Sequence, residues 1–236
     1  MDWGGTLADI TKSLEERLAH DLGRLGCAVS VESVRKALVP AGEFEKRRAE
    51  FGYSKERRRA FWVSWCERVV KGLSVSSNPS ELGERLWDAL DTDEGIWALY
   101  PDAKPALEKL RAGGLKLGII SNWDKPNLAE MCERLGIAHF FDVILPSYEA
   151  EADKPDPAIF KRALLDIRSA AAESVHVGDS VGADARGAEA VGIWPVIVDR
   201  SGSSGPHEVV TVSSLLELPA VFRLEGTALE ETRFRA

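Results

Sequence analysis

Short apolar runs alternate with helical patterns through the part of the chain that follows residue 95. Each run has the length of one strand, and each is followed by residues whose apolar positions recur at helical spacing. The strands that we predict are 115–120, 141–145, 174–177, 194–198 and 209–212. Strands and helices that alternate in this way form a parallel sheet with helices on both faces. The sequence therefore predicts an α/β fold with a doubly wound parallel sheet.

Residues 8 to 92 instead read as one helix after another. The helices that we expect are 14–25, 33–39, one around 61–69 that ends at Gly72, and one around 82–90 that begins near Pro79. Pro40 should end the second helix, because a proline inside a helix removes a hydrogen bond and clashes with the preceding turn. The domains that we expect are an α/β core (1–8 and 93–224), an inserted helical cap (9–92) and a polar C-terminal tail (225–236).

The charge balance restricts the partners of the protein. The chain has 30 Lys and Arg against 38 Asp and Glu, a net charge of -8. General binding to nucleic acid or to an anionic membrane needs a cationic surface, so we expect neither. The three cysteines are widely separated and suggest no disulfide framework. With no apolar run of membrane-spanning length and no secretory signal, we expect a cytoplasmic protein.

Polar residues follow the predicted strands at the edge where parallel sheets bind ligands. The residues concerned are Asp2, Ser121, Asn122, Lys154, Asp179 and Asp184. Taken singly, each has an ordinary explanation, such as the N-cap of a helix. Together they would bring carboxylates, a lysine and a hydroxyl to one place. Such a set suits a divalent cation such as Mg²⁺ and an oxyanion such as phosphate.

The order of these motifs resembles that of the haloacid dehalogenase superfamily, and within it the members with a helical cap inserted after the first motif. The similarity runs through residues 97–192 and is clearest in Ile-Ser-Asn at 120–122, Lys-Pro-Asp-Pro at 154–157 and Gly-Asp at 178–179. Asp-x-Gly-Gly-Thr-Leu at 2–7 with Ser-Asn-Trp-Asp at 121–124 also resembles proteins described as haloacid dehalogenase-like hydrolase domain proteins. The resemblance implies a Rossmann-like core, a Mg²⁺ cofactor and a small phosphorylated metabolite as substrate.

The resemblance also implies a role for each residue. Asp2 would be the nucleophile that forms an aspartyl-phosphate. Ser121 and Asn122 would bind the phosphoryl oxygens, and Lys154 would stabilise charge on both nucleophile and phosphate. The metal ligands would be Asp2, the backbone carbonyl of Gly4, Asp179 and Asp184, with Asp184 either a direct ligand or an organiser of the others.

Gly4 stands where phosphatases of the superfamily usually carry a second aspartate, which protonates the leaving group and then activates water. Losing a positioned acid/base typically costs about 10² to 10⁴ in rate. Three interpretations stay open. The protein is a phosphatase for good leaving groups or one that borrows an acid from the cap or the substrate, an enzyme whose chemistry needs no such acid, or a non-catalytic binder of a phosphometabolite or partner.

Two enzymes of the second kind exist in the superfamily. Dehalogenases need no Mg²⁺, and the intact acidic pattern therefore argues against one. Enzymes similar to phosphonoacetaldehyde hydrolase use a cap lysine as a Schiff base, for which Lys36 and Lys46 are the candidates. Among these interpretations we expect a Mg²⁺-dependent phosphatase, slow because Gly4 replaces the usual acid/base aspartate.

The beginning of the chain and the expected cap give two further predictions. Only Met1 precedes Asp2, although a strand of about five residues should lead into it at the centre of the sheet, so we expect apolar codons upstream in the gene. In the cap, the basic stretch 46–59 is interleaved with glutamates and should be a solvated helix face rather than a collar for an anionic substrate. Trp62 and Trp65 should belong to the cap core.

Overall fold

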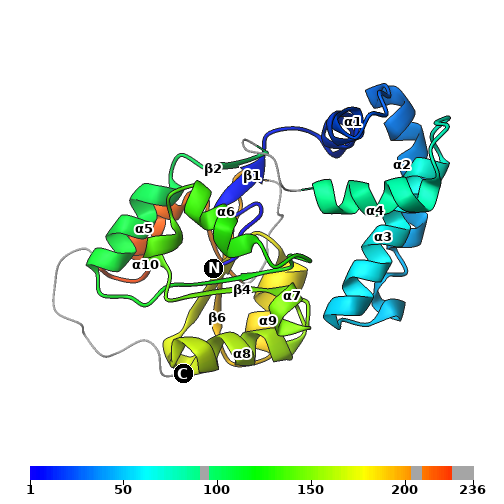
Figure 1. The fold of residues 1–236 in the computed structure, drawn as a ribbon. Coiled ribbons are helices and arrows are strands. Elements are labelled where there is room, and N and C mark those ends of the chain that lie inside the picture. Colours follow the sequence, from blue (N-terminus) through cyan, green and yellow to red (C-terminus); the bar gives the residue numbers. More distant parts are fainter. Residues whose placement is uncertain (91–95, 203–208, 225–236) are drawn as a thin grey trace. The chain divides into compact units, whose positions relative to one another are not determined.

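The protein is described by a computed structural model that defines residues 1–90, 96–202 and 209–224 (Figure 1). It divides into two compact units. One unit comprises Met1–Asp9 and Leu99–Ala236, and the other comprises Ile10–Ala98. We describe each unit by itself. The boundary expected at residues 92 and 93 and the expected tail at 225–236 lie outside the described residues.

The first unit is built on parallel strands. β3 (Gly118–Ser121) pairs with β4 (Val143–Pro146), and β5 (Val175–Gly178) pairs with β6 (Trp194–Val198), which pairs with β7 (Val210–Val212). Ile119 lies opposite Ile144, and Val177 lies opposite Val196. A short pair, β1 (Ala8–Ile10) and β2 (Trp97–Leu99), lies where the chain leaves this unit and returns to it. The predicted α/β fold is confirmed.

Met1 and Asp2 lie between the two groups of strands. The Ile120 amide donates to the Met1 carbonyl at 2.9 Å, and the Met1 nitrogen donates to the Gly118 carbonyl at 2.7 Å. On the other side, the Asp2 amide donates to the Val177 carbonyl at 2.8 Å. These two residues thus join β3 to β5 at the position expected for the strand that leads into Asp2. What precedes Met1 in the gene stays a prediction.

Helices cover both faces of these strands (Figure 1). α8 (Pro157–Ile167) and α9 (Arg186–Glu189) lie on one side, and α5 (Ala103–Ala112) and α10 (Leu218–Val221) lie on the other. The buried side chains of α8, such as Ile159 and Phe160, pack against Ile120 and Leu145 of the sheet. The remaining helical elements of this unit are α6 (Leu128–Arg134), α7 (Ser147–Ala150), η2 (Ala138–Phe140), η3 (Ala171–Glu173), η4 (Val181–Ala185) and η5 (Leu215–Glu217).

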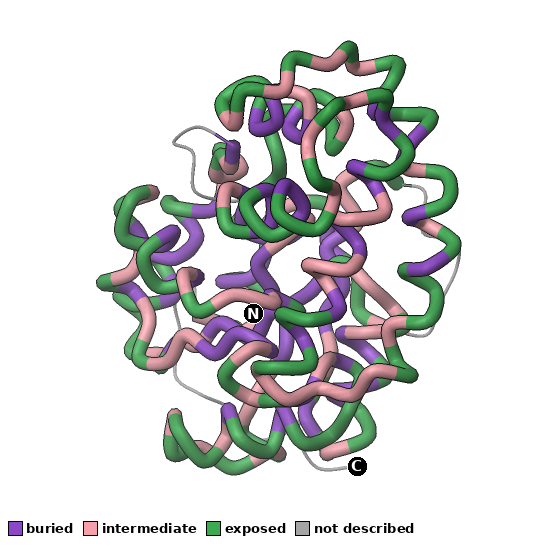
Figure 2. Tube along the Cα trace, turned by 45° about the vertical axis from the view of Figure 1, so that its right-hand side comes forward, coloured by how far each residue is buried: buried purple, intermediate pink, exposed green. Residues whose placement is uncertain are grey.

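The second unit consists of helices around a core of their own. They are α1 (Leu14–Arg24), α2 (Val31–Glu45), α3 (Lys55–Lys71) and α4 (Pro79–Ala89), with a short turn η1 (Arg48–Phe51). Ser13 opens α1 with a capping box to Glu16, and Asn78 caps α4, whose first residue is Pro79. Buried residues, purple in Figure 2, line the inner sides of the helices and the strands of both units.

The expectation that Pro40 ends a helix was wrong. α2 continues through Pro40 to Glu45. Ala41 and Phe44, which follow the proline, are buried in the core of the helical unit, and Phe44 stacks on Phe61 with ring centroids 4.9 Å apart. This burial of apolar surface offsets the lost hydrogen bond, because tertiary packing outweighs local propensity.

Trp62 and Trp65 belong to the core of the helical unit, as predicted. Trp65 is buried, and Trp62 stacks on Trp87 of α4 with centroids 6.0 Å apart. The basic stretch departs from the prediction at Arg48, which is half-buried over the ring of Phe61, and most clearly at Arg58. Arg58 is fully buried rather than solvated, and its Nε donates to the Tyr53 carbonyl at 2.9 Å. Arg59 is exposed and pairs with Glu84 of α4 at 3.0 Å, across helices rather than within one.

Candidate active site

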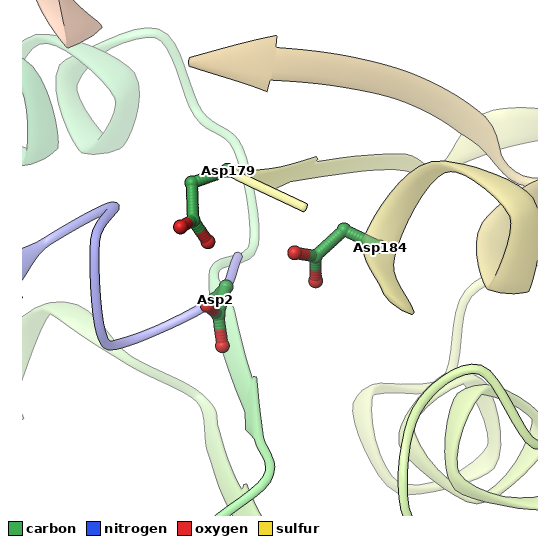
Figure 3. A group of neighbouring side chains, drawn as sticks. All are labelled: Asp2, Asp179 and Asp184. Atoms are coloured by element: carbon green, nitrogen blue, oxygen red, sulfur yellow. The ribbon is translucent and has the colours of Figure 1, made fainter. Parts of the chain in front are cut away.

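The carboxyl ends of the strands bring the predicted acidic residues together. Asp2 follows Met1, which is hydrogen-bonded to β3. Asp179 follows the end of β5, and Asp184 lies in the turn η4. Carboxylate oxygens of all three lie within 4.8 Å of one another (Figure 3). Asp2 and Asp184 are buried, whereas Asp179 is exposed. These three side chains come from distant parts of the sequence and form one acidic group.

Asp184 reaches this group because η4 is a π-type turn. The Ser180 carbonyl accepts from the amides of Asp184 at 2.8 Å and Ala185 at 3.2 Å, and the Ser180 hydroxyl accepts from the Ala183 amide. The Asp184 carboxylate accepts in return from the Ser180 amide at 3.1 Å. Wide turns of this kind are frequent at functional sites, where they redirect a side chain. The sequence predicts an ordinary helix over 183–191, and the turn is visible only in the structure.

Two glycines leave room for the carboxylates. A Cβ on Gly5, whose φ is +74°, would lie 2.3 Å from Oδ2 of Asp179. A Cβ on Gly178 would lie 2.1 Å from Cγ of Asp184. Both distances are far below van der Waals contact, so any side chain at either position would displace a carboxylate. The glycines of the first and last motifs therefore shape the acidic group directly.

Lys154 lies between two of the carboxylates. Its ammonium donates to Oδ1 of Asp2 at 2.5 Å and to Oδ1 of Asp184 at 2.6 Å, and its side chain is almost completely buried. Asn122 holds the backbone of Lys154 at both ends: the Lys154 amide donates to Oδ1 at 2.7 Å, and Nδ2 donates to the Lys154 carbonyl at 3.0 Å. The α8 helix then begins at once, with Asp156 as N-cap and Pro157 as first residue.

Burial and charge shift the pKa values of this group in opposite directions. Burial raises the pKa of Asp2 to about 6, against the opposing charge of Lys154. Burial and repulsion from Asp184 also raise the pKa of Asp179. Burial alone would raise the pKa of Asp184, but the hydrogen bond from His176 and the charge of Lys154 hold it low. Burial opposes the charge on Lys154 too, yet Asp2 and Asp184 keep its pKa above the usual value.

His176 is a part of the site that sequence reasoning missed. It lies in the middle of β5, is buried, and its Nε2 is 2.8 Å from Oδ1 of Asp184. Burial lowers the pKa of His176 to about 4, so the ring is neutral near pH 7 and donates its Nε2 proton to the Asp184 carboxylate. The available signal was a single histidine within the apolar run Ser-Val-His-Val-Gly of a buried strand.

The acidic group fits a divalent cation. It offers only carboxylate oxygens, which Mg²⁺ prefers, and Lys154 neutralises part of their charge. Ser121 is buried at the end of β3, and Gly4 pairs with Ala8 in an isolated bridge two residues after Asp2. The roles of Ser121, Asn122 and the Gly4 carbonyl, and the assignment of the metal ligands, stay predictions.

A family model described as haloacid dehalogenase-like hydrolase matches residues 1–192. The chain belongs to the haloacid dehalogenase-like hydrolase family. It is therefore a hydrolase, and the resemblance of its motifs to the haloacid dehalogenase superfamily is confirmed. No helix within the described residues of this hydrolase is long and apolar enough to cross a bilayer.

Relatives of this hydrolase share most of its length. The mouse haloacid dehalogenase-like hydrolase domain-containing protein 3 is 34% identical over 94% of this chain and 92% of its own. The phosphoserine phosphatase of Thermus thermophilus is 34% identical over 81% of this chain and 82% of its own. Among solved structures, the HAD phosphatase of Thermococcus onnurineus superposes with a TM-score of 0.60 at 25% identity, over 94% of this chain and 95% of that one.

Proposed function

We propose that this protein is a magnesium-dependent hydrolase that removes phosphate from a small phosphorylated metabolite. The observation that carries the proposal is the buried group of Asp2, Lys154 and Asp184, with Asp179 beside it. The relatives named phosphoserine phosphatase and ribulose-1,5-bisphosphate 5-phosphatase support phosphate monoesters as the substrate class.

Asp2 is the proposed nucleophile. One of its oxygens attacks the phosphorus, a new P–O bond forms, and the bond to the leaving oxygen breaks with its electron pair. Water then attacks the phosphorus of the aspartyl-phosphate and gives one proton to solvent, the P–O bond to Asp2 breaks, and the carboxylate is regenerated together with inorganic phosphate. Asp2 is held for both steps by the hydrogen bond from its backbone amide to the Val177 carbonyl and by the ammonium of Lys154.

The other side chains stabilise charge and geometry. Lys154 stays protonated between two carboxylates and stabilises negative charge on the phosphoryl group as it transfers. Asp2, Asp179, Asp184 and the Gly4 carbonyl would hold Mg²⁺, which supplies Lewis-acid neutralisation of the phosphoryl oxygens. His176 keeps the Asp184 carboxylate turned toward Lys154 through its Nε2 proton. Ser121 and Asn122 would bind the remaining phosphoryl oxygens.

Gly4 determines which substrates are favoured, because it cannot protonate the leaving group. The expected substrates are therefore acyl phosphates and esters of acidic alcohols or phenols, whose leaving groups are stable as anions. Phosphonate cleavage through a cap lysine gains no support. The ammonium groups of Lys36 and Lys46 are exposed and pair with Glu32 at 3.7 Å and Glu43 at 2.7 Å, and neither lies in the apolar setting that a Schiff base requires.

The test is turnover by the purified full chain with Mg²⁺ on acetyl phosphate, p-nitrophenyl phosphate and sugar phosphates. Asp2→Asn should lose turnover about a thousandfold or more, because it removes the nucleophile. Asp166→Asn, which alters a carboxylate on the surface of α8 paired with Arg162, is the control and should keep full turnover.

Absence of turnover on all three substrates, combined with thermal stabilisation by Mg²⁺ and phosphate, would instead favour a non-catalytic phosphometabolite binder. The missing acid at Gly4 is the observation that keeps this second function open. Turnover that survives Asp2→Asn unchanged would refute the proposed nucleophile.

A further inference from the structure

Arg200 is a charged residue that the proposed chemistry does not use. It follows β6 at the same edge of the sheet as the acidic group. Its guanidinium donates to Oδ2 of Asp102 at 2.9 Å and to the carbonyl of Thr6 at 2.7 Å. The side chains of Arg200 and Asp102 are only 20% and 11% exposed, so the pair is largely removed from solvent. Largely buried ion pairs need well-placed additional hydrogen bonds to offset desolvation.

Asp102 holds the guanidinium in one orientation. Its Oδ2 also accepts from the Ser214 hydroxyl at 2.7 Å and from the Leu215 amide at 2.9 Å. These donors belong to the start of η5, so the carboxylate is fixed to an element that lies far along the chain. The guanidinium also lies over the ring of Tyr100, at 3.7 Å from the centroid. Arg200 is thus fixed by a carboxylate on one side and an aromatic ring on another.

The third partner of Arg200 is the loop that follows Asp2. In this loop the Trp3 carbonyl accepts from the amides of Leu7 at 2.9 Å and Ala8 at 3.0 Å, which closes residues 3–8 into a compact turn. Arg200 holds the Thr6 carbonyl of the turn, and the Tyr100 amide holds the next carbonyl, that of Leu7, at 3.0 Å. Two consecutive carbonyls are therefore held from outside the loop.

The position of this loop determines how closely it approaches Asp179. Gly5 precedes Thr6, and the site of its missing Cβ lies 2.3 Å from the Asp179 carboxylate. A shift of the Thr6 carbonyl would move Gly5, and with it both the Gly4 carbonyl and the surface against which Asp179 rests. The hydrogen bond from Arg200 is thus separated from a candidate metal ligand by one residue of backbone.

We propose that Arg200 is a positioning residue, which holds the loop of residues 3–8 in the place that lets Asp2, the Gly4 carbonyl and Asp179 converge. An arginine suits this task because its planar group donates in two directions while it stacks on Tyr100, which a lysine cannot do. The effect on the metal rests on the proposed function. The effect on the loop does not.

The test compares Arg200→Met with Arg111→Met in the full chain. Arg111 is a matched control, because it too donates to one backbone carbonyl, that of Leu115, and to one carboxylate, that of Asp142 at 2.7 Å. Asp142 directly precedes β4 and lies at the opposite edge of the sheet from the acidic group. Both variants remove one positive charge from the same unit.

Amide hydrogen exchange of Leu7 and Ala8, measured without metal, reports on the loop itself. Arg200→Met should speed exchange at both amides by about tenfold or more, and Arg111→Met should leave it within about twofold. Calorimetry should then show Mg²⁺ binding about 10- to 100-fold weaker in Arg200→Met only. Arg200→Lys should fall between wild type and Arg200→Met, and it replaces Arg200→Met if that variant does not fold.

Equal exchange at Leu7 and Ala8 in the two methionine variants would overturn the proposal, as would unchanged exchange in Arg200→Lys if only that variant folds. If the wild-type protein takes up no Mg²⁺, the proposed function fails, while the exchange measurement still decides whether Arg200 positions the loop. If exchange accelerates while Mg²⁺ affinity is unchanged, the loop is held by Arg200 but does not set the metal site, and the proposal is again wrong.

Discussion

Replacement of Gly5 by alanine should separate a backbone effect from an effect on the acidic group. Gly5 has a φ of +74°, and a left-handed conformation costs a residue with a Cβ about 1 to 2 kcal/mol. The new Cβ would also lie 2.3 Å from Oδ2 and 2.6 Å from Cγ of Asp179. The carboxylate or the loop must then retreat by about 1 Å to reach ordinary contact. Gly5→Ala should therefore damage both stability and metal binding.

Gly114→Ala provides the control for the backbone effect. Gly114 belongs to the same unit and has a φ of +79°, but a Cβ there would meet nothing within 4 Å. Both variants should lose about 1 to 2 kcal/mol of unfolding free energy, which for a chain of this size lowers Tm by roughly 2 to 8 °C. Disturbing a group that positions a metal ligand typically costs about 10- to 100-fold in metal affinity, and this loss should occur in Gly5→Ala alone.

The assay is Mg²⁺ calorimetry on folded protein, together with thermal unfolding in the absence of metal. A displacement of about 1 Å at a reacting centre also costs about 10² in rate, so turnover with acetyl phosphate should fall with the affinity. The reasoning is refuted if Gly5→Ala binds Mg²⁺ as tightly as Gly114→Ala does. In that case Asp179 either moves without consequence or is not a ligand.

Four other outcomes are expected. Gly4→Asp should raise kcat/KM for alkyl phosphates by about 10² or more relative to kcat/KM for p-nitrophenyl phosphate, whose leaving group needs less help from an acid. An unchanged or lower value would contradict our account of the missing acid. Because the pKa of Asp2 is raised to about 6, a proton competes with the metal below that pH, and calorimetric Mg²⁺ affinity should fall up to about tenfold per pH unit from 6 to 4 and level off above 6. By the same linkage, the protonated form of Asp2 stabilises the metal-free fold, and this contribution is present below about pH 4 and is lost as the pH rises through about 6. Denaturation of wild type and Asp2→Asn over this pH range is the test, and the same pH dependence in both proteins would exclude Asp2 as the source. Phe61→Ala should cost the helical unit about 3 to 5 kcal/mol in urea unfolding, because Phe61 is fully buried against Phe44 and Phe51, and a cost below about 1 kcal/mol would show that this core is not closely packed.

The sequence was sufficient for the elements whose signals are local. Helix starts at Ser13, Asn78 and Asp156 carry capping residues that act within one turn, and the strand predicted at 194–198 matches β6. Strand boundaries elsewhere differ by one to three residues, as at β3, which begins at Gly118 rather than at Leu115. Local propensity failed at Pro40, where burial of Phe44 in a distant packing contact keeps the helix continuous.

The candidate site could be assembled in outline because parallel strands bring their carboxyl ends to one edge. That rule needs only the order of strands and the residues that follow them, and it predicts that Asp2, Asp179 and Asp184 lie together. It could not supply the contacts among them. The bond from Asn122 to the backbone of Lys154 joins residues 32 apart in the chain, and no local pattern encodes it.

The sequence by itself thus determined which side chains form the acidic group, because the order of the strands and the residues after them can be read from consecutive residues. Only the tertiary structure decided how they meet. Burial keeps His176 neutral, whereas neighbouring charges and hydrogen bonds keep Lys154 and Asp184 ionised despite burial. The π-type turn aims Asp184, and Arg200 reaches the Thr6 carbonyl across 194 residues. These properties depend on distances between residues that are remote in the chain. Coulomb energies and desolvation free energies are set by those distances and by burial, which the order of amino acids does not show directly.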